Sequence, residues 1–142
     1  MQFELVRASH NVGESNFHLV FVVAYRKKVF LSKHNLEAAR AYIEEKARAM
    51  KIKIEALEFG PDHVHLFLSH CRRFSSEQLA QLLKGYVSRM MRKHHAPFLR
   101  AWLWGKKFWT SGYFYRSVGS VNSETVKFYI EHCQHKHWNV NY

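Results

Sequence analysis

The sequence has few cysteines, no long hydrophobic run and few acidic residues, and each shortage excludes a class of protein. Two cysteines among 142 residues, Cys71 and Cys133, cannot build the disulfide framework of a small secreted protein. The longest strongly apolar run, residues 19–24, is far shorter than the roughly 20 residues that span a bilayer. The first residues lack the basic start and apolar centre of a secretory signal. We therefore expect a protein that has no membrane association and remains in the cytoplasm.

The shortage of acidic residues gives the chain a net charge of +11, from 22 lysines and arginines against 11 aspartates and glutamates. A small body with this charge attracts polyanions, and nucleic acid is the commonest polyanion in the cytoplasm. The composition is 47% hydrophobic and 15% aromatic, which is enough for a core, and no linker or repeat divides the chain. We expect a single domain over residues 1–142. The charge indicates a class of partner but no chemistry, because a non-catalytic RNA-binding protein would share it.

The hydrophobic pattern predicts strands and helices in the order β-α-β-β-α-β-α. Runs of β-branched and aromatic residues predict the strands, and apolar residues at three- and four-residue spacing predict the helices. The strands are expected at residues 17–25, 51–59, 63–69 and 113–118, and the helices at 35–50, 75–93 and from 123 through 133. This order is typical of an α+β fold, the ferredoxin-like split βαβ antiparallel sheet, here with an extra C-terminal helix. Two helices should cover one face of the sheet, so the functional site is expected on the other face.

Local signals predict where the helices begin and end. Ser75 and Gln78 form the Ser-x-x-Gln pattern of a capping box, which starts the second helix. Pro97 stops that helix, and a loop rich in tryptophan and lysine is expected to follow. Ser123, with Glu124 after it, is expected to cap the final helix.

Two histidines in the third predicted strand, His63 and His65, are the first candidates for chemistry. Side chains alternate along a strand, so both histidines point away from the aliphatic side, which faces the core. Their imidazoles have a spacing suited to one divalent cation, which would need a third ligand and would keep open positions for a phosphate oxygen. The alternative is a pair of surface histidines in a chain that contains 11.

Tyr129 lies in the final predicted helix and admits two interpretations. A tyrosine hydroxyl can attack a phosphodiester when a cation polarises the phosphate, but with an ordinary pKa near ~10 it is a poor nucleophile unaided at pH 7. The alternative is that Tyr129 only packs, because it completes an apolar stripe with Val126, Ile130 and Cys133. Helical periodicity does not distinguish the two.

Basic and aromatic residues elsewhere are suited to single-stranded nucleic acid. Cationic side chains can track a phosphate backbone with salt-sensitive affinity, and exposed aromatic rings can stack on bases, each stack contributing about 1–3 kcal/mol. The basic candidates are Arg26, Lys27, Lys28, Lys84, Arg89, Arg92, Lys93, Lys106 and Lys107, and the aromatic candidates are Trp102, Trp104, Phe108 and Trp109. The alternatives are solvated surface charges and a hydrophobic plug that closes the domain or a dimer.

Several segments, taken in order, resemble a known family. They are FHLVF at 17–21, YRKKVF at 25–30, DHVHL at 62–66, LW at 103–104, SVG at 117–119 and VKFYIE at 126–131. In order and spacing they resemble the small single-tyrosine HUH transposases, the IS200-like TnpA type encoded by the smallest bacterial and archaeal insertion sequences. Each segment alone is a modest signal, and their ordered occurrence across nearly the whole chain makes the resemblance specific.

The resemblance implies a homodimeric transposase that cuts and rejoins single-stranded DNA at hairpin-containing ends of an insertion sequence, without ATP. His63 and His65 match the histidines of the HUH motif, which bind Mg²⁺ or Mn²⁺ and present the scissile phosphate. Tyr129 matches the nucleophile, which forms a 5′-phosphotyrosine and frees a 3′-hydroxyl that can later attack the linkage. In relatives the tyrosine helix of one subunit often completes the active site of the other, so composite sites are expected.

The third metal ligand departs from the family pattern. Relatives commonly have a glutamine four residues after the tyrosine, where this chain has Cys133, with Gln134 after it and His132 before it. His132 and Cys133 both lie within one helical turn of Tyr129. A thiolate is poorly matched to Mg²⁺, whereas an imidazole or an amide would serve Mn²⁺ better. Gln134 is therefore the expected third ligand, and His132 and Cys133 remain alternatives.

Two other functions fit parts of the sequence. A non-catalytic RNA- or DNA-binding module can use the same fold, but it predicts aromatic pairs on the central strands. The third predicted strand instead offers His63 and His65 with only Phe67 as an aromatic, and the glycine-aromatic signature of those domains is missing. A zinc hydrolase or structural zinc protein could use Cys71, Cys133 and histidines, but the sequence has no Cys-x-x-Cys or His-Glu-x-x-His motif.

Overall fold

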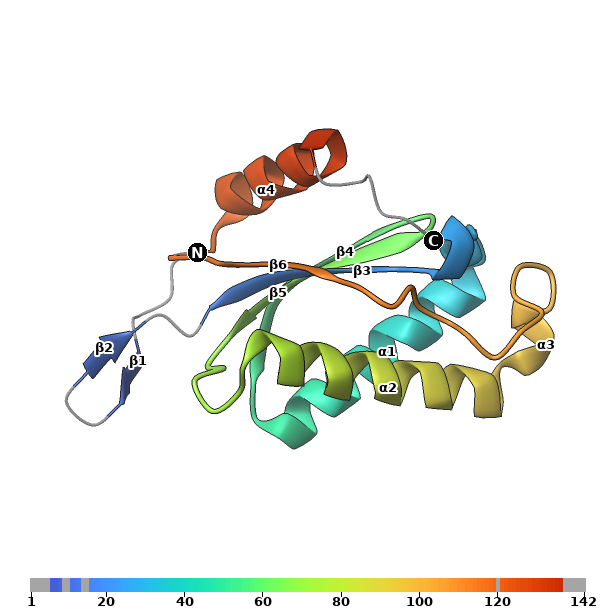
Figure 1. The fold of residues 1–142 in the computed structure, drawn as a ribbon, viewed down its shortest axis with the longest axis horizontal. Helices are drawn as coiled ribbons and strands as arrows, with labels where there is room; N and C mark the ends of the chain where they lie inside the picture. The colour runs from blue at the N-terminus through green and yellow to red at the C-terminus, as the bar shows by residue number, and fades with distance from the viewer. Residues whose placement is uncertain (1–5, 9–10, 14–15, 120, 137–142) are drawn as a thin grey trace.

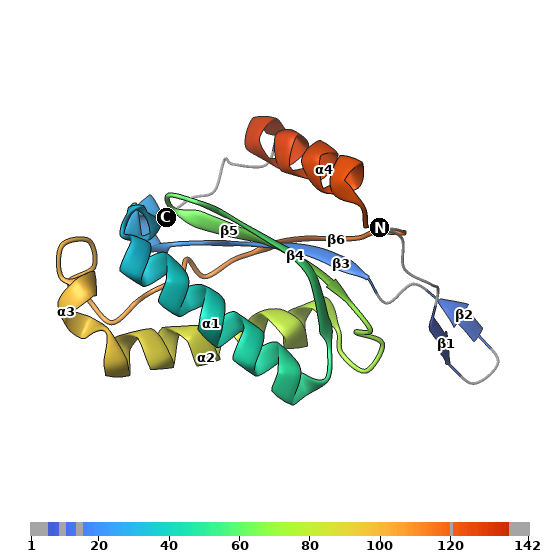
Figure 2. The ribbon, with the colours of Figure 1, turned by 180° about the vertical axis from the view of Figure 1, so that it is seen from behind.

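A four-stranded antiparallel sheet forms the centre of the computed structural model, which describes residues 6–8, 11–13, 16–119 and 121–136. The strands are β3 (Phe17–Val22), β4 (Lys53–Gly60), β5 (His63–Ser69) and β6 (Phe114–Ser117), and their order in the sheet is β4-β5-β3-β6. Helices α1 (Lys33–Met50) and α2 (Ser76–His94) cover one face, and α4 (Ser123–Lys136) lies over the other (Figure 1, Figure 2). The predicted ferredoxin-like α+β fold with an extra C-terminal helix is confirmed.

Shorter elements complete the described chain. A separate antiparallel hairpin near the N-terminus, which the sequence analysis did not predict, joins β1 (Val6–Ala8) to β2 (Asn11–Gly13). The 3-10 helices η1 (Ala24–Arg26) and η2 (Val29–Leu31) follow β3, and α3 (Ala96–Leu99) follows α2. None of the helices in the described ranges is long and apolar enough to span a membrane.

The main core lies between the sheet and helices α1 and α2. On β5 the aliphatic residues Val64, Leu66 and Leu68 are fully buried in this core, as the alternation predicted. The capping box at the start of α2 is confirmed, because Ser75 Oγ accepts from the Gln78 backbone N–H at 3.0 Å and the Ser75 N–H donates to Gln78 Oε1 at 2.9 Å.

Two segments differ from the predicted boundaries. Strand β3 ends at Val22, before the predicted residue 25, because Tyr25 and Arg26 adopt positive φ angles of 57° and 53° and turn the chain into η1. Helix α2 ends at His94, and Pro97 lies in the first turn of α3, where a missing N–H costs nothing. The predicted loop after α2 therefore begins with a short helix.

Helix α4 is capped one residue earlier than predicted. Asn122, and not Ser123, takes the capping role, because its Oδ1 accepts from the backbone N–H of Thr125 at 2.8 Å. The helix then packs on the second face of the sheet through a small apolar cluster. Its members are Phe67, Val118 and Val121, with Ala56, Val126, Tyr129 and Ile130 partly buried against them.

Candidate active site

The face of the sheet that carries α4 brings His63 and His65 together. The pairing of β5 with β3 places both histidines opposite the aliphatic core, as predicted. Their ring centroids are 5.1 Å apart, and only 7% of His63 and 1% of His65 is exposed. The alternative of two surface histidines is therefore wrong, since burial of polar rings on a defined face requires specific partners.

One of these partners is a third histidine, His18 of β3. His18 Nε2 lies 2.9 Å from His65 Nδ1, and the His18 ring stacks on Phe67 with a centroid separation of 4.3 Å. Burial lowers the pKa of His65 to about 3, with a smaller contribution from the neighbouring His63. Burial also lowers the pKa of His18 to about 3, with smaller contributions from His65 and Arg116. Both rings are therefore neutral at pH 7. When His65 donates its Nδ1–H to His18, its Nε2 is the nitrogen presented to a ligand.

Asp62 and Arg26 hold His63. The His63 Nδ1–H donates to Asp62 Oδ1 at 2.8 Å, and Asp62 Oδ2 accepts from Arg26 Nε at 3.0 Å. Gly60 pairs with His63 across the β4–β5 hairpin and leaves room for its ring, because a Cβ at residue 60 would overlap the imidazole. Histidines that bind metals usually donate the second ring nitrogen to a partner in this way, so His63 and His65 both have the supports that metal ligands need.

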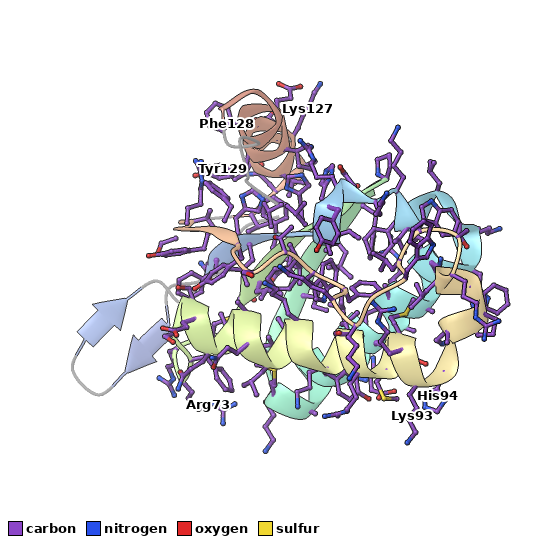
Figure 3. All side chains as sticks on the ribbon, turned by 45° about the vertical axis from the view of Figure 1, so that its right-hand side comes forward. Arg73, Lys93, His94, Lys127, Phe128 and Tyr129 are labelled. Atoms are coloured by element: carbon purple, nitrogen blue, oxygen red, sulfur yellow. The ribbon has the colours of Figure 1, made fainter. Side chains whose placement is uncertain are left out.

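Tyr129 of α4 lies beside His18 in the same chain. Its ring centroid is 5.7 Å from that of His18, and the guanidinium carbon of Arg116 lies 4.7 Å from the ring centroid. Figure 3 shows Tyr129 on α4, on the opposite side of the sheet from Lys93 of α2. Tyr129 is half-buried and belongs to the apolar cluster under α4, so the packing interpretation is correct as far as it goes. The position beside His18, which contacts His65, is compatible with the nucleophile interpretation as well.

The described side chains do not complete a metal site. No group of three or more histidine, cysteine, aspartate or glutamate side chains in the described part of the chain could hold an ion. Gln134, Cys133 and His132 lie in α4, but their side chains fall outside the described residues. Cys71 donates to the Ser69 carbonyl oxygen at 3.4 Å, and burial raises the pKa of its thiol to about 12, so it does not favour the zinc alternative.

The aromatic residue of β5 on the histidine face is not open to a base, as an RNA-recognition module would require. Phe67, the aromatic residue on the histidine face of β5, is fully buried under the His18 ring and the apolar cluster of α4. A base cannot stack on a ring that other side chains already cover.

The basic residues predicted to contact DNA divide into two groups. Three of them, Lys84, Arg92 and Arg26, support the fold. Lys84 Nζ donates to the Thr110 carbonyl oxygen at 2.8 Å, and Arg92 donates to the Lys107 carbonyl oxygen at 2.8 Å. Arg26 donates to the Asp62 carboxylate. The others are exposed: Lys27, Lys28, Arg89, Lys93, Lys106 and Lys107. Arg89 and Lys93 lie on α2, on the far side of the sheet from Tyr129, whereas Lys27, Lys106 and Lys107 line one cleft.

The four aromatic candidates after α3 also divide. Phe108 and Trp109 are buried in the main core, so for them the hydrophobic plug is confirmed. Trp102 is half-buried, and Trp104 is 93% exposed. Among these four, Trp104 is therefore the ring most open to solvent.

Sequence reasoning missed three residues that shape the site: His18, Asp62 and Gly60. His18 alternates with buried Leu19 in β3, which signals that it shares the face of His63 and His65 once the strands are aligned. Asp62 precedes His63 in the DHVHL segment, but its role depends on the hydrogen bond that it accepts from the His63 ring. Gly60 has a signal only in three dimensions, because its role depends on the ring of its cross-strand neighbour.

Comparison with known proteins places the chain among the transposases, which are DNA-processing enzymes. The family model described as "Transposase IS200 like" matches residues 11–133. The chain therefore belongs to the IS200-like transposase family, as its sequence motifs predicted.

Individual relatives agree with this assignment. The chain is 26% identical over 131 residues to the ISDra2 transposase TnpA of Deinococcus radiodurans, covering 92% of each protein. It is 25% identical to the transposase for insertion sequence element IS200 of Salmonella typhimurium, covering 87% of this chain and 80% of the relative. Among solved structures, a candidate transposase from Deinococcus radiodurans superimposes with a TM-score of 0.72 at 21% identity, covering 94% of this chain and 98% of the other. A REP-associated tyrosine transposase bound to a REP hairpin gives 0.58 at 12% identity, covering 93% and 75%.

Proposed function

We propose that this transposase cleaves and rejoins single-stranded DNA at the ends of an insertion sequence through a covalent link to Tyr129. The observation that carries the proposal is the meeting of three elements on one face of the sheet. Strand β5 supplies His63 and His65, β3 supplies His18, and α4 supplies Tyr129, whose ring centroid lies 5.7 Å from that of His18. The partners of the two imidazoles at Nδ1 keep both rings in fixed orientations.

The proposed reaction is a transesterification, so the number of phosphate ester bonds is unchanged. The hydroxyl oxygen of Tyr129 forms a bond to phosphorus and releases its proton to water, and the bond from phosphorus to the 3′ oxygen breaks. The 3′ oxygen takes up a proton and leaves as a hydroxyl, while the other fragment remains attached as a 5′-phosphotyrosine. A 3′-hydroxyl can then attack this linkage and restore both the phosphodiester and the free tyrosine, which explains how rejoining proceeds without ATP.

His63 and His65 fit a divalent metal, Mg²⁺ or Mn²⁺, bound through Nε2. Both rings have a partner at Nδ1, and burial keeps His65 neutral at pH 7. When bound, the ion would polarise the scissile phosphate and so compensate for the weak nucleophilicity of a neutral phenol. We assign the third ligand to Gln134 of α4, with His132 and Cys133 as the alternatives.

Several observations favour a DNA substrate with single-stranded character. The chain has a net charge of +11, and exposed lysines and an exposed tryptophan lie together beyond the end of β3. A structural neighbour with the same fold is a tyrosine transposase bound to a REP hairpin. By analogy, we extend hairpin-containing ends to the substrate of this chain.

We also propose a homodimer with composite active sites. Helix α4 follows a short connection from β6 and rests on the sheet through one small apolar cluster. A cleft of about 530 Å³ lies between α4 and the edge strand β4, lined by residues that include Ala56, Glu58, Val126 and Ile130. A helix with this limited attachment can be exchanged between two copies of the chain at small cost in packing.

The test of the proposed function is the covalent intermediate. The protein is incubated with 3′-labelled single strands from the ends of its own element and Mg²⁺ or Mn²⁺, and the products are separated under denaturing conditions. We expect a labelled protein adduct that is lost with EDTA, abolished by Tyr129→Phe and greatly reduced by His63→Ala. Tyr115→Phe, which alters an exposed tyrosine of β6, serves as the matched control and should leave the adduct unchanged. An adduct that survives Tyr129→Phe would overturn the mechanism.

A further inference from the structure

A second cleft, of about 340 Å³, lies beyond the end of β3, between η1 and the loop that follows α3. We propose that this cleft binds one nucleotide of the single-stranded substrate, with the base stacked on Trp104 or Tyr25 and the phosphate beside the lysines. The inference rests on the proposed function, since it names a subsite for the same strand. The residues that carry the argument are Tyr25, Lys27, Trp102, Trp104, Lys106 and Lys107.

The chemistry of the cleft matches a nucleotide. Trp104 is 93% exposed and Tyr25 is 64% exposed, although large aromatic side chains are usually mostly buried. Trp104 is nevertheless oriented, because its Nε1–H donates to the Arg100 carbonyl oxygen at 3.1 Å. The volume is within the range of small-ligand sites. Rings with open faces next to cationic side chains are the combination that single-strand binding proteins use for a base and its phosphate.

The charge of the lining selects against other ligands. Lys27, Lys106 and Lys107 line the cleft, and no acidic residue is among the described residues that line it. Binding of a cation is therefore disfavoured, and binding of an anion is favoured. The aromatic rings add a preference for an anion that carries a flat apolar group, which a nucleotide provides and inorganic phosphate does not.

Two hydrogen bonds connect the chain segment that lines the cleft to the candidate metal pair. Tyr25 and Lys27 flank Arg26 in η1, and Arg26 Nε donates to Asp62, which accepts from His63 Nδ1. Tyr25 and Arg26 both have positive φ angles, an uncommon conformation for residues other than glycine, which the Arg26–Asp62 bond helps to hold. A nucleotide in the cleft would thus lie near the His63 end of the site, and we assign it to a position next to the cleaved phosphate.

The experiment measures DNA binding without cleavage. Fluorescence anisotropy in EDTA compares the full-length protein with Trp104→Ala and Tyr25→Ala, using labelled oligothymidylate and single strands from the element ends. At least one of the two alanine variants should bind both probes about fivefold or more weakly, because the stacked ring is lost. Trp104→Phe keeps an aromatic ring and should retain most of the original affinity. Tyr115→Ala and Arg48→Ala, which remove an exposed ring and an exposed charge away from the cleft, should bind like the original protein. Circular dichroism confirms folding of each variant.

A second measurement identifies the stacked nucleotide. Element-end strands with one abasic nucleotide, moved along the sequence, should show a single position near the cleavage point at which the missing base weakens binding. At that position the loss should disappear in whichever of Trp104→Ala or Tyr25→Ala weakens binding, because ring and base report one contact.

The outcomes separate this inference from the proposed function. Unchanged affinity of both alanine variants, or an abasic penalty that both retain in full, would overturn the nucleotide site even if the Tyr129 adduct forms. The opposite result is also informative. If no adduct forms, but the abasic penalty disappears in Trp104→Ala or Tyr25→Ala, the cleavage mechanism is removed and the nucleotide site remains in place.

Discussion

His63 and His65 are held by different partners, a carboxylate in one case and a neutral imidazole in the other. The difference makes the Nε2 atoms of the two histidines unequal as metal donors. A carboxylate that accepts from Nδ1–H increases the electron density of the ring and makes Nε2 the stronger donor, whereas a buried neutral histidine mainly fixes orientation. His63, supported by Asp62 and Arg26, should therefore contribute more of the metal affinity than His65.

Replacement of Asp62 tests this support. Asp62→Asn keeps the size of the side chain but removes the charge that accepts from His63 and Arg26. We expect Mn²⁺ affinity, measured by titration calorimetry or electron paramagnetic resonance, to fall by about 10- to 100-fold, the range typical for partners of ligating histidines. Glu37→Gln removes an exposed carboxylate that pairs only with Lys33 in α1 and should bind Mn²⁺ normally. If Asp62→Asn binds Mn²⁺ as tightly as the original protein does, the hydrogen bond has no role in metal binding.

Gly60 offers a test that changes no polar group. In Gly60→Ala the new methyl would overlap the His63 ring, so the ring must move from its bond with Asp62. We expect weaker Mn²⁺ binding and a reduced rate of adduct formation, with the thermal unfolding transition still cooperative. Gly85→Ala is the matched control, because nothing lies within 4 Å of a Cβ at that position of α2. It should raise the free energy of unfolding by about 1 kcal/mol and leave metal binding unchanged, as expected for alanine in a helix.

At the scale of elements, the sequence predicted those whose signals are local. The alternation of β5 and the Ser75–Gln78 capping box depend on neighbours in the chain, and both are confirmed. The end of β3 depends on distant contacts, because Val23 N–H donates to the Asp62 carbonyl oxygen and Ala24 N–H to that of Phe108. No local pattern contains those partners.

The candidate site divides in the same way. His63 and His65 could be identified from alternation and the family motif, and Tyr129 from the motif alone. Lys84 could not be assigned from sequence, because three backbone carbonyl oxygens that surround its ammonium group come from residues 110–112. A lysine on a helix has the same sequence pattern whether it contacts DNA or ties down a loop.

Lys84→Met separates these two roles. It keeps the apolar stem and removes the bonds to the loop, so we expect a loss of about 1–3 kcal/mol in the free energy of unfolding by urea. Burial, with a smaller effect of Lys107, lowers the pKa of Lys84 to about 8. Between pH 8 and its ordinary value of 10.5 the unfolded chain binds more protons, so the stability of the original protein should rise with pH in this window. The contribution of Lys84 to that rise should be missing in the variant.

Arg89→Ala is the comparison for Lys84→Met. Arg89 is exposed on the same helix and lies over the Tyr86 ring, so its loss should change stability little. Normal stability of Lys84→Met together with weakened DNA binding would contradict the structural role and return Lys84 to the DNA-contacting group.

At the scale of the whole molecule, the two faces of the sheet have different tasks. The α1–α2 face holds the main core, and the α4 face holds the buried histidines and Tyr129 under a small apolar cluster. Tyr129, the proposed nucleophile, therefore lies on a helix that rests on the sheet through one small apolar cluster, while the histidines lie on central strands of the sheet. This division favours a helix that can serve either its own sheet or that of a second copy.

Mixing two inactive variants decides which copy the tyrosine serves. His63→Ala lacks the metal pair but retains Tyr129, and Tyr129→Phe retains the metal pair but lacks the nucleophile. In a dimer with composite sites, a mixed pair contains one site with both histidines and the partner's tyrosine, so we expect adduct formation to return when the variants are mixed and allowed to exchange. The DNA should be attached to the His63→Ala chain, which a size tag identifies on a denaturing gel. If Tyr129 acts only within its own chain, as its 5.7 Å separation from His18 permits, every site in the mixture carries one defect and no adduct returns. Sedimentation of the unmixed proteins tests whether each variant forms the proposed dimer.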